Sequence, residues 1–396
     1  MHASAIIQGL LDQECHQMHA KRRACVAKVA TAALRGGLSL ICMAKKLAAG
    51  TKLRHRIKCC DRLLGNPHLA LEKQSVYRAM ARRVLQGRTH VQIAVDWSAV
   101  RTDSSAQLLR AAAIIKGRAF TLYEEVHPLT LLGSPSVHRK FMFALRSVLP
   151  PGTQAIIITD AGFRATWFKL LNQLGFAWVG RIRNRDMVSA HSSGIWSGCK
   201  TLYAQARAQA LDMGSHFYAR SNPTLCRLVL MKCLPKGRRQ LTKTGQPARS
   251  CRSKKNSKTQ SEPWLLAVSP KLAHLTADQV IHIYSGRMQI EQTFRDIKNA
   301  QWGLGLSHSQ TYNIQRLAIL LLLGALLTYA LWLIGLAARN AGYNITYGSR
   351  TKAAATLSIL SLAMHWIEDK HRQMINLTNL KHALTEMQKM VRTYEI

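Results

Sequence analysis

Acidic residues are scarce in this chain. Of its 396 residues only 19 are Asp or Glu, whereas 56 are Lys or Arg, which gives a formal net charge of +37. This balance excludes an acidic regulatory protein and is typical of proteins whose partner is a polyanion, either nucleic acid or an anionic membrane surface. Because 47% of the residues are hydrophobic, the chain can form substantial cores, and a mainly disordered protein is excluded as well.

Cysteine pairing and an export signal are also missing from the sequence. The 9 cysteines are odd in number and form no C-x-x-C pair, which excludes a disulfide framework. Cys59 and Cys60 are adjacent, a spacing that suits a tetrahedral zinc site poorly. The first residues include Asp12 and Glu14 where a signal peptide would have a basic and then an apolar stretch. We therefore expect a protein of a reducing compartment, the cytoplasm.

Residues 317–338 form one long uncharged segment. Its length and hydropathy would allow it to span a bilayer, so it favours a membrane-associated protein. A fully buried core helix has the same composition, and the charged amphipathic sequence on both sides favours that interpretation. We expect a core helix and no membrane partner, with membrane association as the alternative.

The periodicity of the apolar residues predicts an α/β protein with helical ends. We expect five regions: 1–90, helical, basic and suited to DNA binding; 91–184, three strands and then helix, strand, helix, strand; 185–262, a β-rich insertion; 263–300, a strand and a long helix; and 301–396, a helical tail. Within the insertion, residues 235–258 carry many basic residues and no acidic one, which predicts a loop that contacts phosphate.

Two of the rare carboxylates lie at the carboxyl ends of predicted buried strands. Asp96 belongs to the apolar run 91–98, and Asp160 ends the run 154–160. Sheet geometry could bring these side chains together, although a single Asp at a strand end is also a common turn residue. Carboxylates are the ligands that Mg²⁺ prefers, and a pair of such ions supports phosphoryl displacement. A third carboxylate is then expected.

The predicted long helix 275–299 supplies that carboxylate. It opens with the capping-box pattern of Thr276 and Gln279. Four of its residues lie at offsets of 0, 3, 7 and 14 and would share one helix face: Tyr284, Arg287, Glu291 and Lys298. An acid thus lies between side chains that suit phosphate, because Arg binds phosphate through paired donors and Lys supplies a point charge.

These segments together resemble bacterial insertion-sequence transposases of the DDE type with a YREK signature. The resemblance rests on YSGRMQIEQTFRDIKN (284–299), on VDWS around Asp96 and on TDAGFR around Asp160, and it extends over most of the chain. It indicates the hairpin-forming cut-and-paste class, insertion sequence family four. It implies a ribonuclease-H-like catalytic core interrupted by a β-rich insertion, with a helical DNA-binding region before it and a helical region after it.

The resemblance also implies roles for single residues. The DDE triad, which holds two Mg²⁺ ions or Mn²⁺ in their place, corresponds to Asp96, Asp160 and Glu291. The residues that grip the transposon end correspond to Tyr284, Arg287 and Lys298, and the base-stacking tryptophan corresponds to Trp264. Trp264 could equally be a core residue of its strand. Some relatives have a second tryptophan directly after the signature Arg, where this chain has Met288.

The reaction implied by the resemblance is metal-dependent cut-and-paste transposition. The strand is nicked, the freed 3′-OH forms a hairpin, the hairpin is opened, and the DNA is joined to a target. The partners are double-stranded DNA with terminal inverted repeats, target DNA and a second copy of the chain in a synaptic complex, all near the bacterial nucleoid. A catalytically inactive DNA-binding protein or repressor derived from such an enzyme is the alternative, and the presence of all three acids argues against it.

Overall fold

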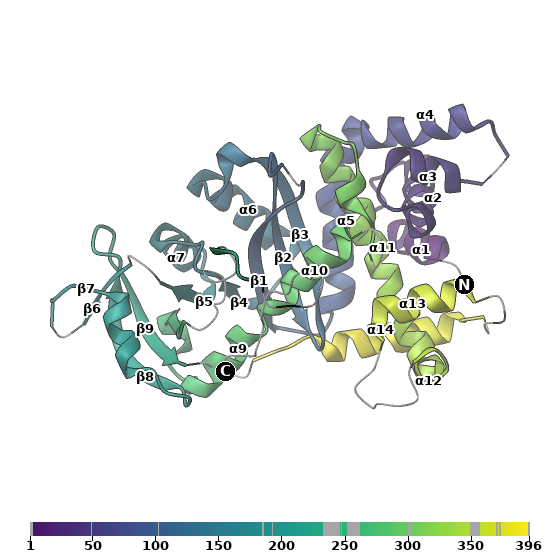
Figure 1. The fold of residues 1–396 in the computed structure, drawn as a ribbon. Coiled ribbons are helices and arrows are strands. Elements are labelled where there is room, and N and C mark those ends of the chain that lie inside the picture. Colours follow the sequence, from purple (N-terminus) through teal and green to yellow (C-terminus); the bar gives the residue numbers. More distant parts are fainter. Residues whose placement is uncertain are drawn as a thin grey trace. The chain divides into compact units, whose positions relative to one another are not determined.

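The fold is described from a computed structural model of the whole chain (Figure 1). It describes residues 3–48, 50–101, 103–183, 186–191, 193–232, 246, 248–251, 262–299, 303–348, 357–369, 371 and 374–394. The chain divides into two compact units. Unit 1 comprises Met1–Thr153 and Met288–Glu395, and unit 2 comprises Gln154–Arg287. Each unit is described separately below.

Unit 1 combines three antiparallel strands with helices from both ends of the chain. Its strands are β1 (His90–Ala99), β2 (Ala106–Ile115) and β3 (Arg118–Pro128), in the order β3-β2-β1. Its helices are α1 (Ala3–Glu14), α2 (Ala20–Gly36), α3 (Leu40–Lys46), α4 (Leu53–Leu64), α5 (Pro67–Leu85), α6 (Pro135–Val148), α10 (Met288–Lys298), α11 (Ile314–Asn340), α12 (Tyr343–Tyr347), α13 (Ile359–Glu368) and α14 (Leu377–Met390).

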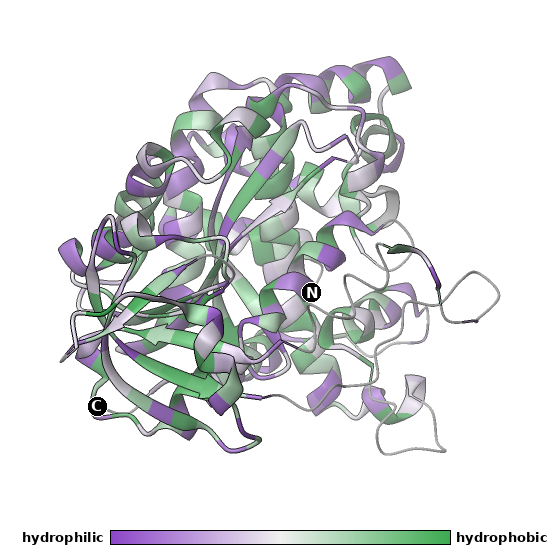
Figure 2. Ribbon diagram, turned by 60° about the vertical axis from the view of Figure 1, so that its left-hand side comes forward, coloured by the Kyte–Doolittle hydropathy of each residue, from purple (hydrophilic) through white to green (hydrophobic). Residues whose placement is uncertain are grey.

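The three strands of unit 1 form the core on which the helices pack. Every residue of β2 is buried, because β1 and β3 flank it and helices cover it. Apolar residues occur along the strands and also on the helices (Figure 2). The hairpin between β2 and β3 turns at Gly117, whose φ of 93° lies in the left-handed region that glycine adopts without steric cost. The three strands expected at the start of region 91–184 are therefore present.

The long apolar segment is a core helix of unit 1. Helix α11 is long and apolar enough to cross a membrane, yet 89% of its most apolar window is buried inside the protein. It packs against α1, α2, α5, α13, α14 and β3. At Gly335 a Cβ would lie 2.1 Å from the carbonyl oxygen of Ile359, so α13 approaches the α11 backbone directly. The expectation of a buried helix is confirmed.

Unit 2 is a sheet with helices. Its strands are β4 (Gln154–Thr159), β5 (Ala177–Ile182), β6 (Met187–Ala190), β7 (Ser197–Gly198), β8 (Leu211–Tyr218), β9 (Thr224–Met231) and β10 (Trp264–Val268), in the order β4-β5-β10-β9-β8-β6-β7. Its α-helices are α7 (Ala165–Gln173) and α9 (Ala277–Ser285). Strands β4 and β5 are parallel, as expected for strands joined by the crossover helix α7. The basic stretch 235–258 lies almost entirely outside the described residues.

The prediction of one continuous helix over 275–299 is wrong. The capping box of Thr276 and Gln279 is present and begins α9, but α9 ends at Ser285 and α10 begins at Met288. At the break, the N–H of Gly286 donates to the carbonyl of Ile283 and that of Arg287 to the carbonyl of Tyr284, in place of a continued i→i−4 ladder. Glycine is a weak helix former, which explains why the ladder is interrupted there.

Candidate catalytic site

Asp96 lies inside β1, three residues before the strand ends. Its side chain is 9% exposed, and its Oδ1 accepts a hydrogen bond of 2.8 Å from the backbone N–H of Trp97. In the β1–β2 register its Cα partner is Arg110, and Arg110 is in turn the partner of Glu124 on β3. An acid, a base and an acid therefore form one row across the three strands.

The residue after Asp96 is fixed by a buried histidine. Trp97 Nε1 donates a hydrogen bond of 3.0 Å to Nε2 of His138, which lies on α6. Burial lowers the pKa of His138 to about 4, so the imidazole is neutral at pH 7 and can accept this bond. This contact ties α6 to the segment of β1 that carries Asp96.

Glu291 lies in the first turn of α10, in the same unit as Asp96. Helix α10 packs against β1, β2 and β3. It buries Ile290, Phe294 and Ile297, which recur at spacings of four and three residues and form its apolar face. Glu291 itself is half-buried. The fold thus brings the helix of the third predicted acid against the strand of the first.

Lys298, at the other end of α10, is directed to β1. Its Nζ donates a hydrogen bond of 2.6 Å to Oγ of Ser98 and lies 5.5 Å from the centre of the Phe294 ring. Burial, helped by the positive charge of Arg110 and opposed by Asp96, lowers the pKa of Lys298 to about 8. Glu291 and Lys298 are seven residues apart within this one helix, so they share a face.

Asp160 belongs to unit 2 and directly follows β4. Its Oδ1 accepts a hydrogen bond of 2.8 Å from the backbone N–H of Gly162. A Cβ on Gly162 would lie 3.0 Å from that oxygen, so the turn after the strand is tight at this point. The carboxyl group is half-buried at the end of a parallel strand, which is where the sequence predicts it.

Unit 2 also brings Trp264 and Tyr284 together. The ring centres of the two residues are 4.9 Å apart and the rings meet edge to face at 76°. Tyr284 is 4% exposed, and burial raises the pKa of its hydroxyl even though the positive charges of Arg287 and Arg181 lower it. Tyr284 therefore packs edge to face against Trp264 and lies close to the positive charge of Arg287.

Within the described ranges, no group of three or more His, Cys, Asp or Glu side chains forms a ready-made metal site. Asp96 and Glu291 lie in unit 1 and Asp160 in unit 2. The donor set fits a hard divalent cation, because all three side chains offer carboxylate oxygen and none offers sulfur. A softer metal would be expected to select thiolate or imidazole ligands.

Residues 88–328 match the sequence model of the transposase DDE domain family. The match spans more than half of the chain and includes all seven predicted site residues. The chain belongs to this family. No curated protein matches the chain. Family membership makes the chain a DDE transposase in the general sense and implies that DNA is a partner.

The sequence analysis did not identify the buried pair Arg110 and Glu124, which lies in one row with Asp96 across the strands. Arg110 and Glu124 are 2% and 3% exposed, and Oε1 of Glu124 also accepts a hydrogen bond of 2.9 Å from the hydroxyl of Tyr77 on α5. The available signal was a charged residue within the apolar run 108–115 and two more in the run 119–126. Charged residues on buried strands need partners, so they could have been predicted to pair.

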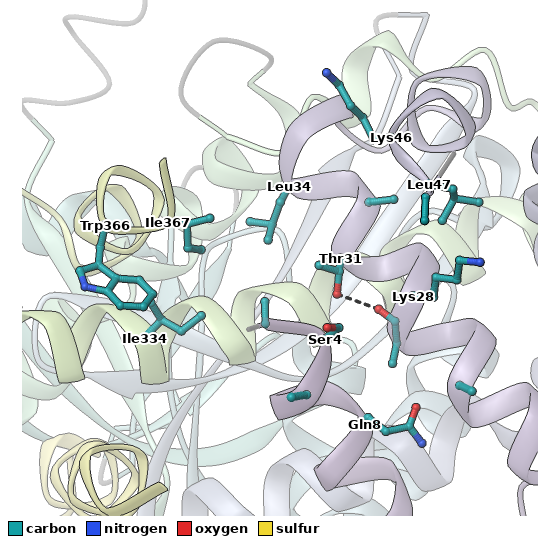
Figure 3. Close-up of a pocket in the computed structure, with 16 residues that line it drawn as sticks. Ser4, Gln8, Lys28, Thr31, Leu34, Lys46, Leu47, Ile334, Trp366 and Ile367 are labelled. Atoms are coloured by element: carbon teal, nitrogen blue, oxygen red, sulfur yellow. Dashed lines mark hydrogen bonds between the residues drawn. The ribbon is translucent and has the colours of Figure 1, made fainter. Parts of the chain in front are cut away.

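A cavity of about 570 Å³ lies elsewhere in unit 1, among the amino-terminal helices and the tail (Figure 3). Ala27, Thr31, Ile334 and Trp366 are among its lining residues. Thr31 Oγ1 donates its hydrogen bond of 2.7 Å to the carbonyl of Ala27 in its own helix. None of the predicted catalytic residues lines this cavity, so it is separate from the candidate site.

Proposed function

We propose that this transposase binds transposon ends and carries out metal-dependent cut-and-paste transposition. The observation that carries the proposal is the family match over 88–328, which contains Asp96, Asp160 and Glu291. The packing of α10 on β1 supports it, because it brings the elements of two of these acids together within one unit. The specific class proposed is the hairpin-forming one with the YREK signature.

The order of elements supports a ribonuclease-H-like core. Three antiparallel strands are followed by α6, β4, α7 and β5, and β4 pairs with β5 in parallel. Strands β6 to β9 come before β10 and the signature helices, as a β-rich insertion would. In this proposal residues 1–90 bind DNA, residues 91–184 and 263–300 form the core, residues 185–262 are the insertion and residues 301–396 are the helical tail.

Asp96, Asp160 and Glu291 would hold two Mg²⁺ ions, or Mn²⁺ in their place. When bound, such ions activate a water or 3′-hydroxyl nucleophile and stabilise the leaving oxygen of an in-line displacement. Binding and orientation of the DNA would be the task of the protein's own side chains. Arg287, whose positive charge lies close to Tyr284, is suited to bind phosphate through paired donors.

Trp264 would hold the base that leaves the stack when the hairpin forms. Its ring is half-buried and is supported at its edge by Tyr284. Stacking of a base on an aromatic ring contributes about 1–3 kcal/mol, enough to favour an extruded nucleotide. Lys298 would bind phosphate near the reacting strand from its place beside Ser98.

The proposed partners are double-stranded DNA and a second copy of the chain. DNA ends would be bound as a pair in a synaptic complex, and target DNA would follow. The net charge of +37 supports phosphate binding throughout. The proposed location is the bacterial cytoplasm, at the nucleoid.

A nicking assay tests this proposal. A plasmid that carries the gene with its flanking DNA would be incubated with the protein and Mg²⁺, and nicks, hairpins and excised fragments would be separated on denaturing gels. Asp96→Asn preserves side-chain volume but removes the charge, and a loss of roughly 4 kcal/mol of metal stabilisation corresponds to about a thousandfold slower nicking. Equal cleavage by wild type and Asp96→Asn would refute the triad. DNA binding without cleavage by the wild type would favour the inactive repressor.

A further inference from the structure

Helix α10 makes a side-chain contact to each of the three strands of unit 1. Lys298 Nζ donates to Ser98 Oγ on β1 at 2.6 Å. Arg110 Nη1 on β2 donates to Thr293 Oγ1 at 2.9 Å. Arg118 Nη1, at the start of β3, donates to Asp296 Oδ2 at 2.6 Å. The same helix also buries Ile290, Phe294 and Ile297 and packs against these strands. Figure 1 shows α10 beside β1, β2 and β3.

The contact from β2 differs from the other two because it is deeply buried. Arg110 is 2% exposed, and its guanidinium is already held by Glu124, with 2.8 Å from Nε and 2.6 Å from Nη2 to Oε2. The guanidinium carbon also lies 5.0 Å from the centre of the Phe294 ring. The contacts with Glu124 therefore fix the orientation of the Arg110 guanidinium independently of Thr293. The hydrogen bond to Thr293 then forms only if α10 is placed to match it.

A buried ion pair is weak support for stability, because desolvation of the two charges offsets their attraction. Its geometric effect is stronger. Successive residues of a helix are about 100° apart, so a small rotation of α10 would remove Thr293 from Arg110. A buried charged donor left without its acceptor costs more than the hydrogen bond itself contributes. The hydrogen bond between Arg110 and Thr293 therefore favours one rotation of α10 about its own axis.

Arg110 is also connected to both predicted catalytic acids of unit 1, Asp96 and Glu291. It is the Cα partner of Asp96 in the β1–β2 register, and Thr293, which it binds, lies two residues after Glu291 on α10. We propose that Arg110 is a positioning residue that sets α10, and through it Glu291, relative to Asp96. The inference rests on the proposed function, in which these two acids act together.

The test uses Thr293, because its substitution leaves the Arg110–Glu124 pair intact. Thr293→Val keeps the side-chain shape and removes the hydroxyl, whereas Thr293→Ser keeps the hydroxyl. Thr328→Val is the matched control, because the Thr328 hydroxyl donates to the carbonyl of Gly324 in its own helix α11. Hydrogen–deuterium exchange of α10 would be measured on each full-length protein without DNA or metal, next to single-turnover nicking over a range of Mg²⁺ concentrations.

We expect α10 in Thr293→Val to exchange about tenfold faster, which matches the loss of one hydrogen bond to a charged group. Nicking should slow by about 10- to 100-fold, because a small misplacement of a catalytic group has effects of this size. The half-saturating Mg²⁺ concentration should rise, the affinity for end DNA should stay constant, and Thr293→Ser and Thr328→Val should behave as the wild type.

Two results would overturn the inference. The first is unchanged exchange in α10 of Thr293→Val, and the second is faster exchange with wild-type nicking and an unchanged response to Mg²⁺. If the wild type nicks no DNA, the proposed function fails by itself. The exchange data would then still test whether Arg110 positions α10. The affinity for Mn²⁺, measured by electron paramagnetic resonance on the same variants, would provide a second test.

Discussion

Arg110 and Glu124 lie opposite each other on neighbouring strands and form an ion pair whose side chains are 2% and 1% exposed. Glu124 also accepts the Tyr77 hydroxyl, and Arg110 donates to Thr293. The pair therefore connects α5, the strands and α10 through the centre of unit 1. Removal of one partner leaves a buried charge unpaired, whereas removal of both charges does not.

This asymmetry gives the first prediction. Arg110→Met should lower the free energy of unfolding by about 3–5 kcal/mol, because the buried Glu124 carboxyl group is then left without its partner. Adding Glu124→Gln, which still accepts the Tyr77 hydroxyl, should restore most of that loss. Urea unfolding of the single and double variants measures both effects. Asp12→Asn, which breaks the exposed pair of Asp12 and Arg23, is the control and should cost less than about 1 kcal/mol.

A second prediction concerns the contact between Lys298 and Ser98. Ser98→Ala removes the acceptor of the half-buried ammonium group and should slow nicking by about three- to tenfold, equivalent to about 1 kcal/mol. End-DNA affinity, measured by fluorescence anisotropy, should also fall, by no more than about tenfold, because Ser98 holds the Lys298 side chain that is proposed to bind phosphate. Ser75→Ala removes a hydroxyl bonded to the carbonyl of Glu72 in its own helix and is the control. Wild-type nicking by Ser98→Ala would show that this contact is dispensable.

A third prediction tests the close packing of α11. Gly335→Ala should destabilise the protein by about 1–3 kcal/mol, because the added methyl group would lie 2.1 Å from the backbone oxygen of Ile359 and the helices must separate. At Gly9, in α1, no heavy atom of the described residues lies within 4 Å of the new Cβ, so Gly9→Ala should stabilise by about 0.5–1 kcal/mol. Thermal unfolding of the two variants should therefore shift in opposite directions.

The fourth prediction separates nicking from hairpin formation. Trp264→Ala should reduce hairpin product by about tenfold or more, since base stacking contributes about 1–3 kcal/mol, while the first nick proceeds at nearly the wild-type rate. Trp264→Phe keeps an aromatic face and should recover much of the hairpin yield. The ratio of hairpin to nicked product on denaturing gels is the measurement. If Trp264→Ala slows both steps equally, Trp264 serves as a core residue beside Tyr284.

The order of strands and helices over residues 91–184 was predictable because apolar periodicity and turn residues are local signals. Gly117 is an example, since only its neighbours and its own conformation determine the hairpin. The break at Gly286 was not predictable in the same way. The apolar and charged spacing of 275–299 fits one helix, and the interruption depends on local hydrogen bonds at Gly286 and Arg287 that the spacing does not encode.

The sequence by itself determined the family, the large positive charge and the three rare acids at strand and helix positions. It also determined that residues 317–338 are apolar, but not whether they meet lipid or protein. Only the tertiary structure decided that question, by packing other elements around α11. It likewise decided that Arg110 on β2 binds Glu124 on β3 and Thr293 on α10, because the partner of a buried charge is set by strand register and helix packing rather than by distance along the chain.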